Sequence, residues 1–488
     1  MAANNSNSSN NLSSIDAKYV ESLAREDPSW LISLRKDAFA KYQSLPSEVS
    51  PLYKKYSDVN KISPEKIRLA SGEQASNAPI SKELADRLEE LERETGILQI
   101  GQQRATVIVP DAVRKQGVII STLKDALRDN GDLIRSHLEA NPIDSLEDKF
   151  LALEASCFQS GVFVHVPKNT VVENPIRVIS SLADDGTSLI SRNVIIAETG
   201  SKATVVQELY APGVSGEQDK LQQQHHHQQQ GYFELVESHV SPNAHLEMVT
   251  LQAMAADTIN VSNRKAFVER DGKMSWYIGM FGSLLSRYKT DSIMKASGAS
   301  AEDVEIIFGA NTQSFDVTSN LLHFGPHSRG RVLVKSVLKD TSKSLFKGMI
   351  KIGKDGKGTE SYLAGHAILL DKGAKSDSIP GLEIETNEVK ATHSASVAQM
   401  DENQIYYLTT RGLSREGAKR EIVSGFLEPL SRKMGPTIRA WVNYLIENKW
   451  QGRPLMLRTD EAMEQILEVE KSRYRETQDI FEKHYKYR

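Results

Sequence analysis

The stretch GVFVHVPKNTVVENPIRVI, residues 161–179, indicates the fold of this chain. Val162, Val164 and Val166 lie at every second position, which is the spacing of a β-strand with one buried face. The Pro-Lys-Asn-Thr sequence that follows is typical of a turn, and Ile176–Ile179 then begins a second short β-type run. The stretch therefore predicts short strands joined by tight turns.

Short runs of this kind continue towards the C-terminus. They are Leu189–Ile196, Ala203–Leu209, His245–Leu251, Lys265–Val268, Ser275–Phe281, Val304–Phe308, Arg331–Leu338, Phe346–Ile352, His366–Leu370 and Leu382–Ile384. No long helical pattern separates them, so stacked β-sandwiches and a parallel β-solenoid both fit. No fixed sequence period is visible that would choose between these two architectures.

Helical patterns precede this β-rich middle. A helix is expected to begin at the candidate N-cap Ser81, with Glu83 and Arg87 paired four residues apart on its exposed face. The other elements predicted in the first third are helices within Ile15–Ser44 that are interrupted at Pro28, a strand over Ala105–Val109 and a helical stretch over Ser121–Leu138.

Helical patterns return after Asp401. Asp401 is a candidate capping-box residue with Gln404, Gly412 ends that helix, and Ser414 begins the next one. Further helices are predicted over Ile438–Ile446 and Thr459–Tyr487. The apolar stripe of the first two helices is Ile405, Leu408, Ile422 and Phe426. We expect this stripe to pack against the end of the β-rich core, because a solenoid needs its terminal coils covered.

The sequence divides into four predicted parts. These are a disordered tail over 1–11, a mainly helical domain over 12–145, a β core over 146–400 and a helical domain over 401–488. Within the core, the Gln- and His-rich segment 217–231 is predicted to be a disordered loop. Three adjacent histidines in such a segment lack the fixed geometry of a metal site.

Composition excludes several classes of protein. The 488 residues carry a formal net charge of −4, so no global field attracts nucleic acid, and no apolar run is long enough to span a membrane. The N-terminus lacks the basic and apolar regions of a signal peptide, and Cys157 is the only cysteine, which fits a reducing cytoplasm. Apolar neighbours predict that Cys157 is buried and unreactive.

Three segments carry a resemblance to a known family. Asp148–Val178 resembles the entry to the core of SufB and SufD proteins, His323–Ile352 is similar in order and character, and Leu382–Leu430 resembles their most recognisable C-terminal block. The resemblance implies a right-handed parallel β-helix flanked by helical domains. It also implies a function in iron–sulfur cluster assembly, with sulfur delivered by a cysteine desulfurase system.

The resemblance further implies two partners. Members of the family pair through their β-helix cores, so the expected partner is a SufB-like paralogue or a second copy of this chain. They also dock a SufC-type ABC ATPase on the C-terminal helices, where polar and aromatic residues are left outside the apolar stripe. The docking candidates here are Gln404, Tyr407, Arg411, Arg415 and Glu416.

The family's cluster-ligand positions are mostly lost in this chain. The cysteine that SufB-like members carry before the LEI-like strand corresponds to Ala374, and the cysteine common in SufD-like members corresponds to Ala391. The acidic–His–acidic triplet of SufB-like members reads Thr392, His393, Ser394. His393 is therefore the one candidate iron or cluster ligand, and its alternative reading is a structural histidine.

These departures favour a SufD-like, non-catalytic subunit that contributes to a transient iron–sulfur cluster at a subunit interface and binds none alone. A cluster-bearing SufB-like scaffold is one alternative. A β-helix enzyme acting on polysaccharide is another, but such enzymes are usually secreted and bind sugars with aromatic residues, whereas this chain shows no signal-peptide pattern and only 7% aromatic residues. Other enzyme readings lack support, because the chain has no GxSxG, HExxH or CxxC motif and KIGKDGKG at 351–358 lacks phosphate-loop spacing.

Overall fold

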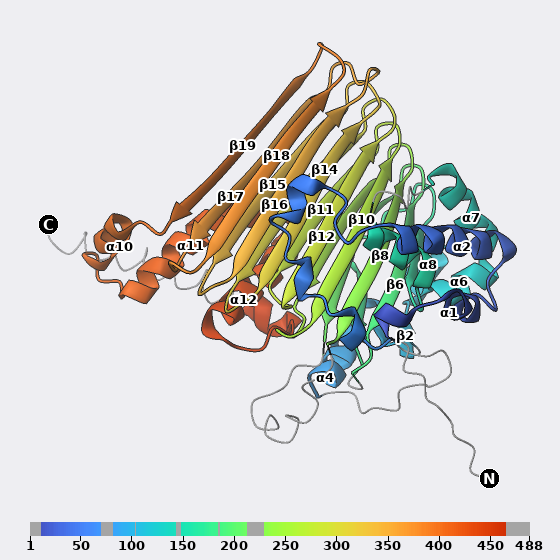
Figure 1. Cartoon of the computed structure of the whole chain (residues 1–488), viewed down its shortest axis with the longest axis horizontal. Coiled ribbons are helices and arrows are strands. Elements are labelled where there is room, and N and C mark those ends of the chain that lie inside the picture. Colours follow the sequence, from blue (N-terminus) through green and yellow to red (C-terminus); the bar gives the residue numbers. More distant parts are fainter. Residues whose placement is uncertain are drawn as a thin grey trace, which may run out of the picture.

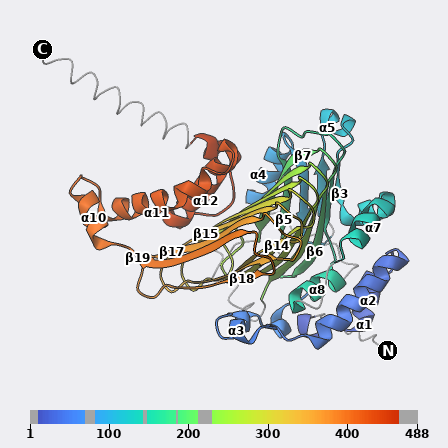
Figure 2. The same cartoon turned by 90° about the horizontal axis from the view of Figure 1, so that it is seen from above.

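The computed structural model describes residues 11–69, 82–102, 104–142, 148–183, 186–211 and 229–464. Its core is a parallel β-helix in which consecutive strands from β4 to β19 alternate between two sheets (Figures 1 and 2). The ten-stranded sheet runs in the order β19 (Lys390–Gln399), β17 (Glu360–Leu369), β15 (Arg329–Leu338), β13 (Ser300–Gly309), β11 (Lys273–Met280), β9 (His245–Gln252), β7 (Lys202–Tyr210), β5 (Ile176–Ser181), β1 (Thr95–Ile100) and β2 (Arg104–Ile108). The nine-stranded sheet runs in the order β18 (Lys375–Ile384), β16 (Lys343–Ile352), β14 (Ser314–His323), β12 (Leu285–Met294), β10 (Ile259–Val268), β8 (Gly231–Val240), β6 (Leu189–Ala197), β4 (Val162–Val166) and β3 (Ile119–Thr122).

Every predicted β-type run falls on one of these strands, and the solenoid alternative is the correct one. The pairing between coils is parallel and in register, as between β14 and β16, where Ser314 pairs with Lys343. In the middle coils both strand faces are buried, as in β10 and β8, because one face lines the interior and helices cover the other. The hand of the helix stays a prediction.

A column of left-handed turn residues runs along one edge of the β-helix. Its members are Asn169, Gly200, Asn243, Asp271, Gly298, His327 and Gly358, with φ between 54° and 73°. Each member before Gly358 donates its backbone N–H to the carbonyl that precedes the next member of the column, as Asp271 does to Ser297. A Cβ on Gly298 would lie 2.1 Å from the Asp271 Oδ1. Glycine therefore occupies this position of the column, because a side chain there would collide with the turn residue of the preceding coil.

The N-terminal part closes one end of the β-helix. Strands β2 and β3 pair antiparallel with β1 and β4. The helices of this part are α1 (Ala17–Leu23), α2 (Ser29–Ser44), α3 (Pro51–Lys54), α4 (Lys82–Leu91), α5 (Asp111–Lys115), α6 (Leu123–Asp129), α7 (Gly131–Ala140) and α8 (Lys149–Cys157), with short 3-10 turns at Leu12–Ser14, Val59–Lys61 and Pro64–Lys66. Helices α1, α2 and α8 pack on the outer face of the nine-stranded sheet.

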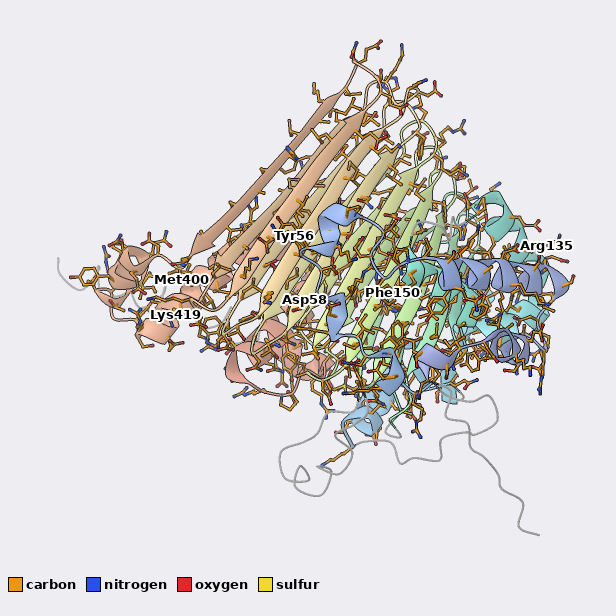
Figure 3. The ribbon with its side chains drawn as sticks, in the orientation of Figure 1. Tyr56, Asp58, Arg135, Phe150, Met400 and Lys419 are labelled. Atoms are coloured by element: carbon orange, nitrogen blue, oxygen red, sulfur yellow. The ribbon has the colours of Figure 1, made fainter. Side chains whose placement is uncertain are left out.

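The segment after α3 crosses the nine-stranded sheet, and Tyr56 and Asp58 lie over its strands in Figure 3. The Ser57 hydroxyl donates to Asp316 at 2.9 Å, and the Lys61 ammonium donates to the Thr312 carbonyl at 2.7 Å. The interruption predicted at Pro28 is confirmed, because Pro28 caps α2. Ser81 lies outside the described residues.

The C-terminal helices are α10 (Glu402–Thr409), α11 (Arg415–Ser431) and α12 (Pro436–Gln451). They were expected to cover the end of the core, and this expectation is wrong. Helices α11 and α12 pack on the outer face of the ten-stranded sheet, where Val423 and Leu427 join Val304 and Ile306 in one apolar cluster. The last coil, β18 and β19, is left uncovered at its end (Figures 1 and 2).

Several local predictions need correction. Arg87 is fully buried rather than on an exposed helix face. Asp401 caps α10 through the backbone N–H of Asn403, without a reciprocal bond from Gln404. Residues 217–228 of the predicted loop, most of the predicted tail and residues beyond 464 lie outside the described residues, while Gln229 donates to the Lys61 carbonyl at 2.8 Å. The domain limits stay predictions. No helix in the described ranges is long and apolar enough to cross a membrane.

Candidate functional site

The open end of the β-helix is the first candidate site. Strands β18 and β19 form its rim, and within the described ranges no other strand pairs with their outer edges. Residues that would face the interior in a middle coil are exposed here: Leu382 and Ile384 on β18 are 39% and 41% exposed, and Val397 on β19 is 46% exposed. A free strand edge beside exposed apolar side chains is a surface suited to pairing with another chain.

The two rim strands differ in how well they could accept a partner strand. Strand β18 contains Pro380, which has no N–H to offer, and the charged residues Asp377 and Glu383. Strand β19 has no proline, and between Lys390 and Gln399 it carries no charged side chain. The edge of β19 is therefore the better site for strand addition.

His393 lies on this rim. It pairs in register with Leu363 of β17, whose side chain belongs to the interior core, so the imidazole lies on the interior side of β19. His393 is exposed because no further coil covers it. Its neighbour Ser394 faces outward and contacts the hydroxyl of Tyr362 at 3.0 Å, whereas no side-chain hydrogen bond of His393 is found among the described residues.

The family's two lost cysteine positions lie near the same rim. Ala374 is buried against the interior core, and Ala391 on β19 packs against it. His393 is thus close in register to Ala391, two residues earlier on the strand, and both face the same side. This end of the described chain supplies an imidazole and no thiol.

The predicted docking residues lie on α10, on the following turn and at the start of α11. The Arg411 guanidinium lies 4.9 Å from the centre of the Tyr407 ring and donates to its hydroxyl at 3.1 Å. Arg415 forms an ion pair with Glu402 at 2.6 Å, which ties the start of α11 to α10. Gln404 and Glu416 are exposed, and Glu416 pairs instead with Lys419 at 3.0 Å.

The local sequence explains this arrangement of α10 and α11. Gly412 has a φ of 95°, which ends the first helical segment, and the Ser414 hydroxyl accepts the N–H of Gly417 to cap α11. Ile405 is buried, while Tyr406 and Tyr407 are 71% and 57% exposed. Two exposed tyrosines beside arginines are the residue types that anchor protein interfaces.

Cys157 is not an accessible nucleophile. It ends α8, has no exposed surface, and lies beneath α2 on the nine-stranded sheet. Burial raises the pKa of its thiol to about 11, so the thiol stays protonated at neutral pH. The prediction of a buried cysteine is confirmed.

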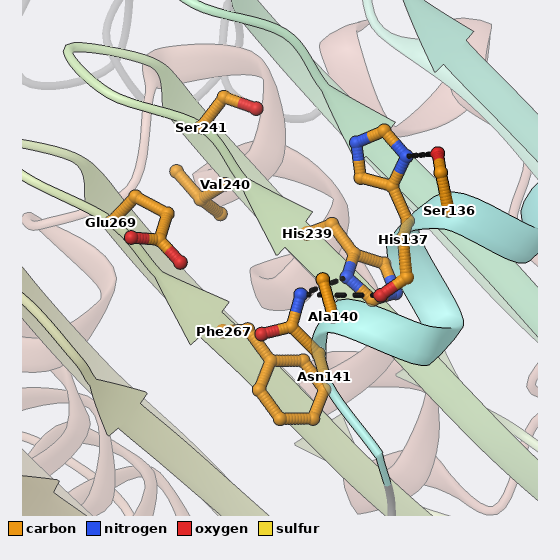
Figure 4. Close-up of a pocket in the computed structure, with 9 residues that line it drawn as sticks. All are labelled: Ser136, His137, Ala140, Asn141, His239, Val240, Ser241, Phe267 and Glu269. Carbon is orange, nitrogen blue, oxygen red and sulfur yellow. Dashed lines mark hydrogen bonds between the residues drawn. The ribbon is translucent and has the colours of Figure 1, made fainter. Parts of the chain in front are cut away.

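A pocket of about 270 Å³ lies beneath α7 (Figure 4). Its walls include His137 and His239, whose ring centres are 5.5 Å apart, and Asn141 donates to the Nδ1 of His239 at 3.2 Å. Burial lowers the pKa of His239 to about 3, so this imidazole is neutral. Across the described ranges, no group of three or more His, Cys, Asp or Glu side chains is arranged to hold a metal ion.

The interior of the β-helix holds polar groups that sequence reasoning missed. Glu234 accepts hydrogen bonds from Arg264 at 2.5 Å and from Gln207 at 2.7 Å, and all three are fully buried. Asp303 and Glu305 on β13 form a second buried group. Among the charged residues, only Glu305 lies inside a predicted β-type run, Val304–Phe308, and only the register shows that these side chains point inward.

Comparison with known proteins agrees with this architecture. The family model described as "SUF system FeS cluster assembly, SufBD core domain" matches residues 179–426, and "SufBD protein N-terminal region" matches residues 7–178. A protein of Staphylococcus epidermidis called "Iron-sulfur cluster assembly SufBD family protein" is 27% identical over 340 residues, 70% of each chain. Similarly named proteins of Staphylococcus haemolyticus and Staphylococcus aureus are 27% and 26% identical over the same shares of both chains. The core match alone covers half of the sequence, so this chain belongs to the SufBD family of iron–sulfur cluster assembly proteins.

Proposed function

We propose that this chain is a SufD-like scaffold subunit without turnover of its own. It pairs through the open end of its β-helix with a SufB-like chain or with a second copy, and it docks a SufC-type ABC ATPase on α10 and the start of α11. The cluster is cargo that is assembled at the paired open ends, from sulfur supplied by a cysteine desulfurase system.

The observation that carries this proposal is the chemistry of the open end. Clusters are held by thiolates, with imidazole as an occasional ligand. The rim presents His393, whereas the one cysteine of the chain, Cys157, is buried beneath α2. A partner must therefore contribute the thiolates, which favours a SufB-like paralogue over a homodimer and a SufD-like role over a SufB-like one.

The ATPase is assigned to α10 and the start of α11 because α10 projects from the β-helix next to the open end (Figures 1 and 2). Strand β19 passes directly into α10 through Met400 and Asp401. Movement of a protein docked on α10 would therefore act on β19 and on His393 through a short stretch of chain.

Anaerobic reconstitution tests the proposal. The isolated chain is incubated with iron and sulfide, and bound iron is counted alone and together with a SufB-like partner. We expect no stable cluster on the isolated chain, because a [4Fe–4S] cluster normally takes four protein ligands. A stoichiometric cluster on the isolated chain would instead support the SufB-like alternative.

The role of His393 is tested in the assembled complex. His393→Ala is expected to lower cluster assembly while the thermal midpoint and ATPase binding stay unchanged. Thr392→Ala is the matched control, because this neighbour faces the outer side of the same strand. A loss of stability with unchanged assembly would make His393 a structural residue.

A further inference from the structure

A buried group of charges lies where the N-terminal and C-terminal parts of the chain meet on the ten-stranded sheet. Arg87 of α4 and Arg177 of β5 both donate to the carboxylate of Glu208 on β7, at 2.9 Å and 3.0 Å. Arg87 and Glu208 have no exposed surface, and Arg177 has 1%. One carboxylate thus holds two guanidinium groups from segments far apart in the sequence.

The charge state of this group is settled by its neighbours. Burial alone would raise the pKa of Glu208, but the charges of Arg177 and Arg87, with a hydrogen bond from Tyr210, lower it to about 2. Glu94 lies 3.3 Å from Arg87 and 3.6 Å from Arg177, so a second carboxylate balances the second arginine. Glu208 is therefore ionised at neutral pH, and the buried guanidinium groups of Arg87 and Arg177 depend on it for compensation.

The C-terminal segment completes this group. The indole of Trp441 on α12 lies 4.0 Å from the Arg177 guanidinium. The Tyr210 hydroxyl donates to Glu208 at 2.6 Å and accepts the backbone N–H of Leu457 at 3.2 Å. We call Arg87, Arg177, Glu208, Tyr210 and Trp441 the charged joint.

Half-buried contacts lie beside the joint. Arg458 pairs with Asp86 of α4 at 2.7 Å, and the Thr459 hydroxyl donates to Glu90 of the same helix at 2.8 Å. Glu90 in turn pairs with Arg87 at 3.1 Å. A continuous series of contacts therefore connects the C-terminal segment to the buried charges: Thr459 contacts Glu90, and Glu90 contacts Arg87.

We infer that the charged joint couples the stability of α4 to that of α12, so that loosening either helix opens the other. A guanidinium that loses its place against Glu208 is left buried and uncompensated, which is costly, so the members of the joint order or release together. Coupling of this kind is reciprocal by thermodynamic necessity. The C-terminal helices are thus fixed at the α12 end, which leaves α10 at their outer end free to respond to a partner.

Hydrogen exchange of the full chain, read by mass spectrometry, tests this inference. Trp441→Leu is expected to speed exchange in α4 at least about fivefold, the lower end of typical coupling, although Trp441 is on a different helix. Trp450→Leu is the matched control: it is also on α12, but packs on Phe308 with ring centres 5.8 Å apart and does not contact the joint.

The reciprocal variant keeps the test decisive if Trp441→Leu fails to fold. Asp86→Ala removes the half-buried contact of α4 with Arg458, and faster exchange in α12 is expected. Unchanged exchange of the partner helix in a folded variant would overturn the inference. So would an equal change in α4 on substitution of Trp450, because the effect would then reflect general loosening of α12.

Discussion

Single buried side chains carry much of the pH dependence expected of this protein. Asp303 and Glu305 lie two residues apart on the inward face of β13, and the Ser319 hydroxyl donates to Glu305 at 2.7 Å. Burial, together with the charge of Glu305, raises the pKa of Asp303 well above its usual value, and burial raises that of Glu305 to about 7. Arg264 is the cation that faces the pair. The folded protein therefore keeps protons that the unfolded chain releases above about pH 4.5.

Stability should consequently fall as the pH rises from about 5 towards 8, because the folded pKa values exceed the unfolded ones. Glu305→Gln is expected to flatten this dependence and to raise the free energy of unfolding at pH 8 by about 1–3 kcal/mol. The introduced amide can donate to Asp303 without adding charge. Urea titrations of both proteins at pH 5 and pH 8 measure the effect. A parallel fall in stability in both proteins would contradict this account.

Glu208 differs from Asp303 and Glu305, because the two arginines beside it lower its pKa, whereas burial raises theirs. Glu208→Gln leaves Arg87 and Arg177 without this negative charge in a buried site, and a loss of about 3–5 kcal/mol is expected. The comparison variant is Glu302→Gln, which breaks a half-buried pair with Lys433 and should cost about 1 kcal/mol or less. Chemical denaturation distinguishes the two. Equal losses would mean that the joint contributes no more than a surface ion pair.

The burial of Cys157 could be predicted from the sequence, whereas the position of Arg87 could not. The apolar neighbours of Cys157 lie beside it in the chain, so local pattern was sufficient. Arg87 fitted an exposed i,i+4 pair with Glu83, but its actual partner, Glu208, is 121 residues away. Only the packed structure brings that carboxylate to it.

Among the elements, strands were predicted best where their inward faces are apolar. β11, with Trp276 and Ile278 inside, was recognised, but β1, β3, β8, β12, β14 and β19 were missed. β12 and β14 carry inward polar residues such as Thr290 and Ser319, so their sequences lack the alternation of apolar and polar residues by which a strand is recognised. The coil length also varies, since Ile259 pairs with Leu285 and Lys343 pairs with Lys375, so no fixed period could appear. The left-handed turn residues mark each coil more clearly than the strands do.

The edge of β19 supports a prediction about pairing. Val397→Lys places a charge among the exposed apolar residues of the open end and is expected to abolish pairing with a SufB-like chain or a second copy. Ala398→Lys adds the same charge to the exposed outer face of the same strand and should leave pairing intact. Sedimentation of each purified variant, alone and with the partner, gives the answer. Pairing that survives Val397→Lys would place the interface elsewhere.

Helices α10 and α11 support a prediction about docking. Tyr407→Ala or a charge reversal at Arg411 is expected to weaken ATPase binding by about 1–3 kcal/mol, because each removes a large contact with a hydrogen-bonding tip. Since Arg411 rests on Tyr407, the two substitutions should be less than additive. Calorimetry with the purified ATPase measures binding, and thermal melts check folding. Arg432→Ala, at an exposed i,i+4 pair with Glu428 near the end of α11, serves as a control that retains this aromatic contact.

At the scale of the molecule, the C-terminal helices cover an apolar face rather than an end. Val304, Ile306 and Phe308 of β13 lie beneath them, together with residues of β9 and β11. A chain that ends at Met400 should therefore keep its coils but expose this face, bind a hydrophobic dye and aggregate at lower temperature than the full chain. Dye fluorescence and light scattering during a thermal ramp follow both effects. A truncated chain that stays monomeric and dye-free would show that the helices are dispensable for the core.

The charged joint also has a consequence for the order of events during synthesis. Asp86 emerges from the ribosome 372 residues before its partner Arg458, a delay of roughly 20–75 s at ordinary translation rates. During that interval the coils can stack one after another, and α4 can pack beside Arg177 and Glu208 before Trp441 has been synthesised. Helix α12, which is made late, thus contacts β5 in one of the first coils through Trp441 and Arg177. A nascent chain released before Trp441 is made would leave the Arg177 guanidinium without its indole contact.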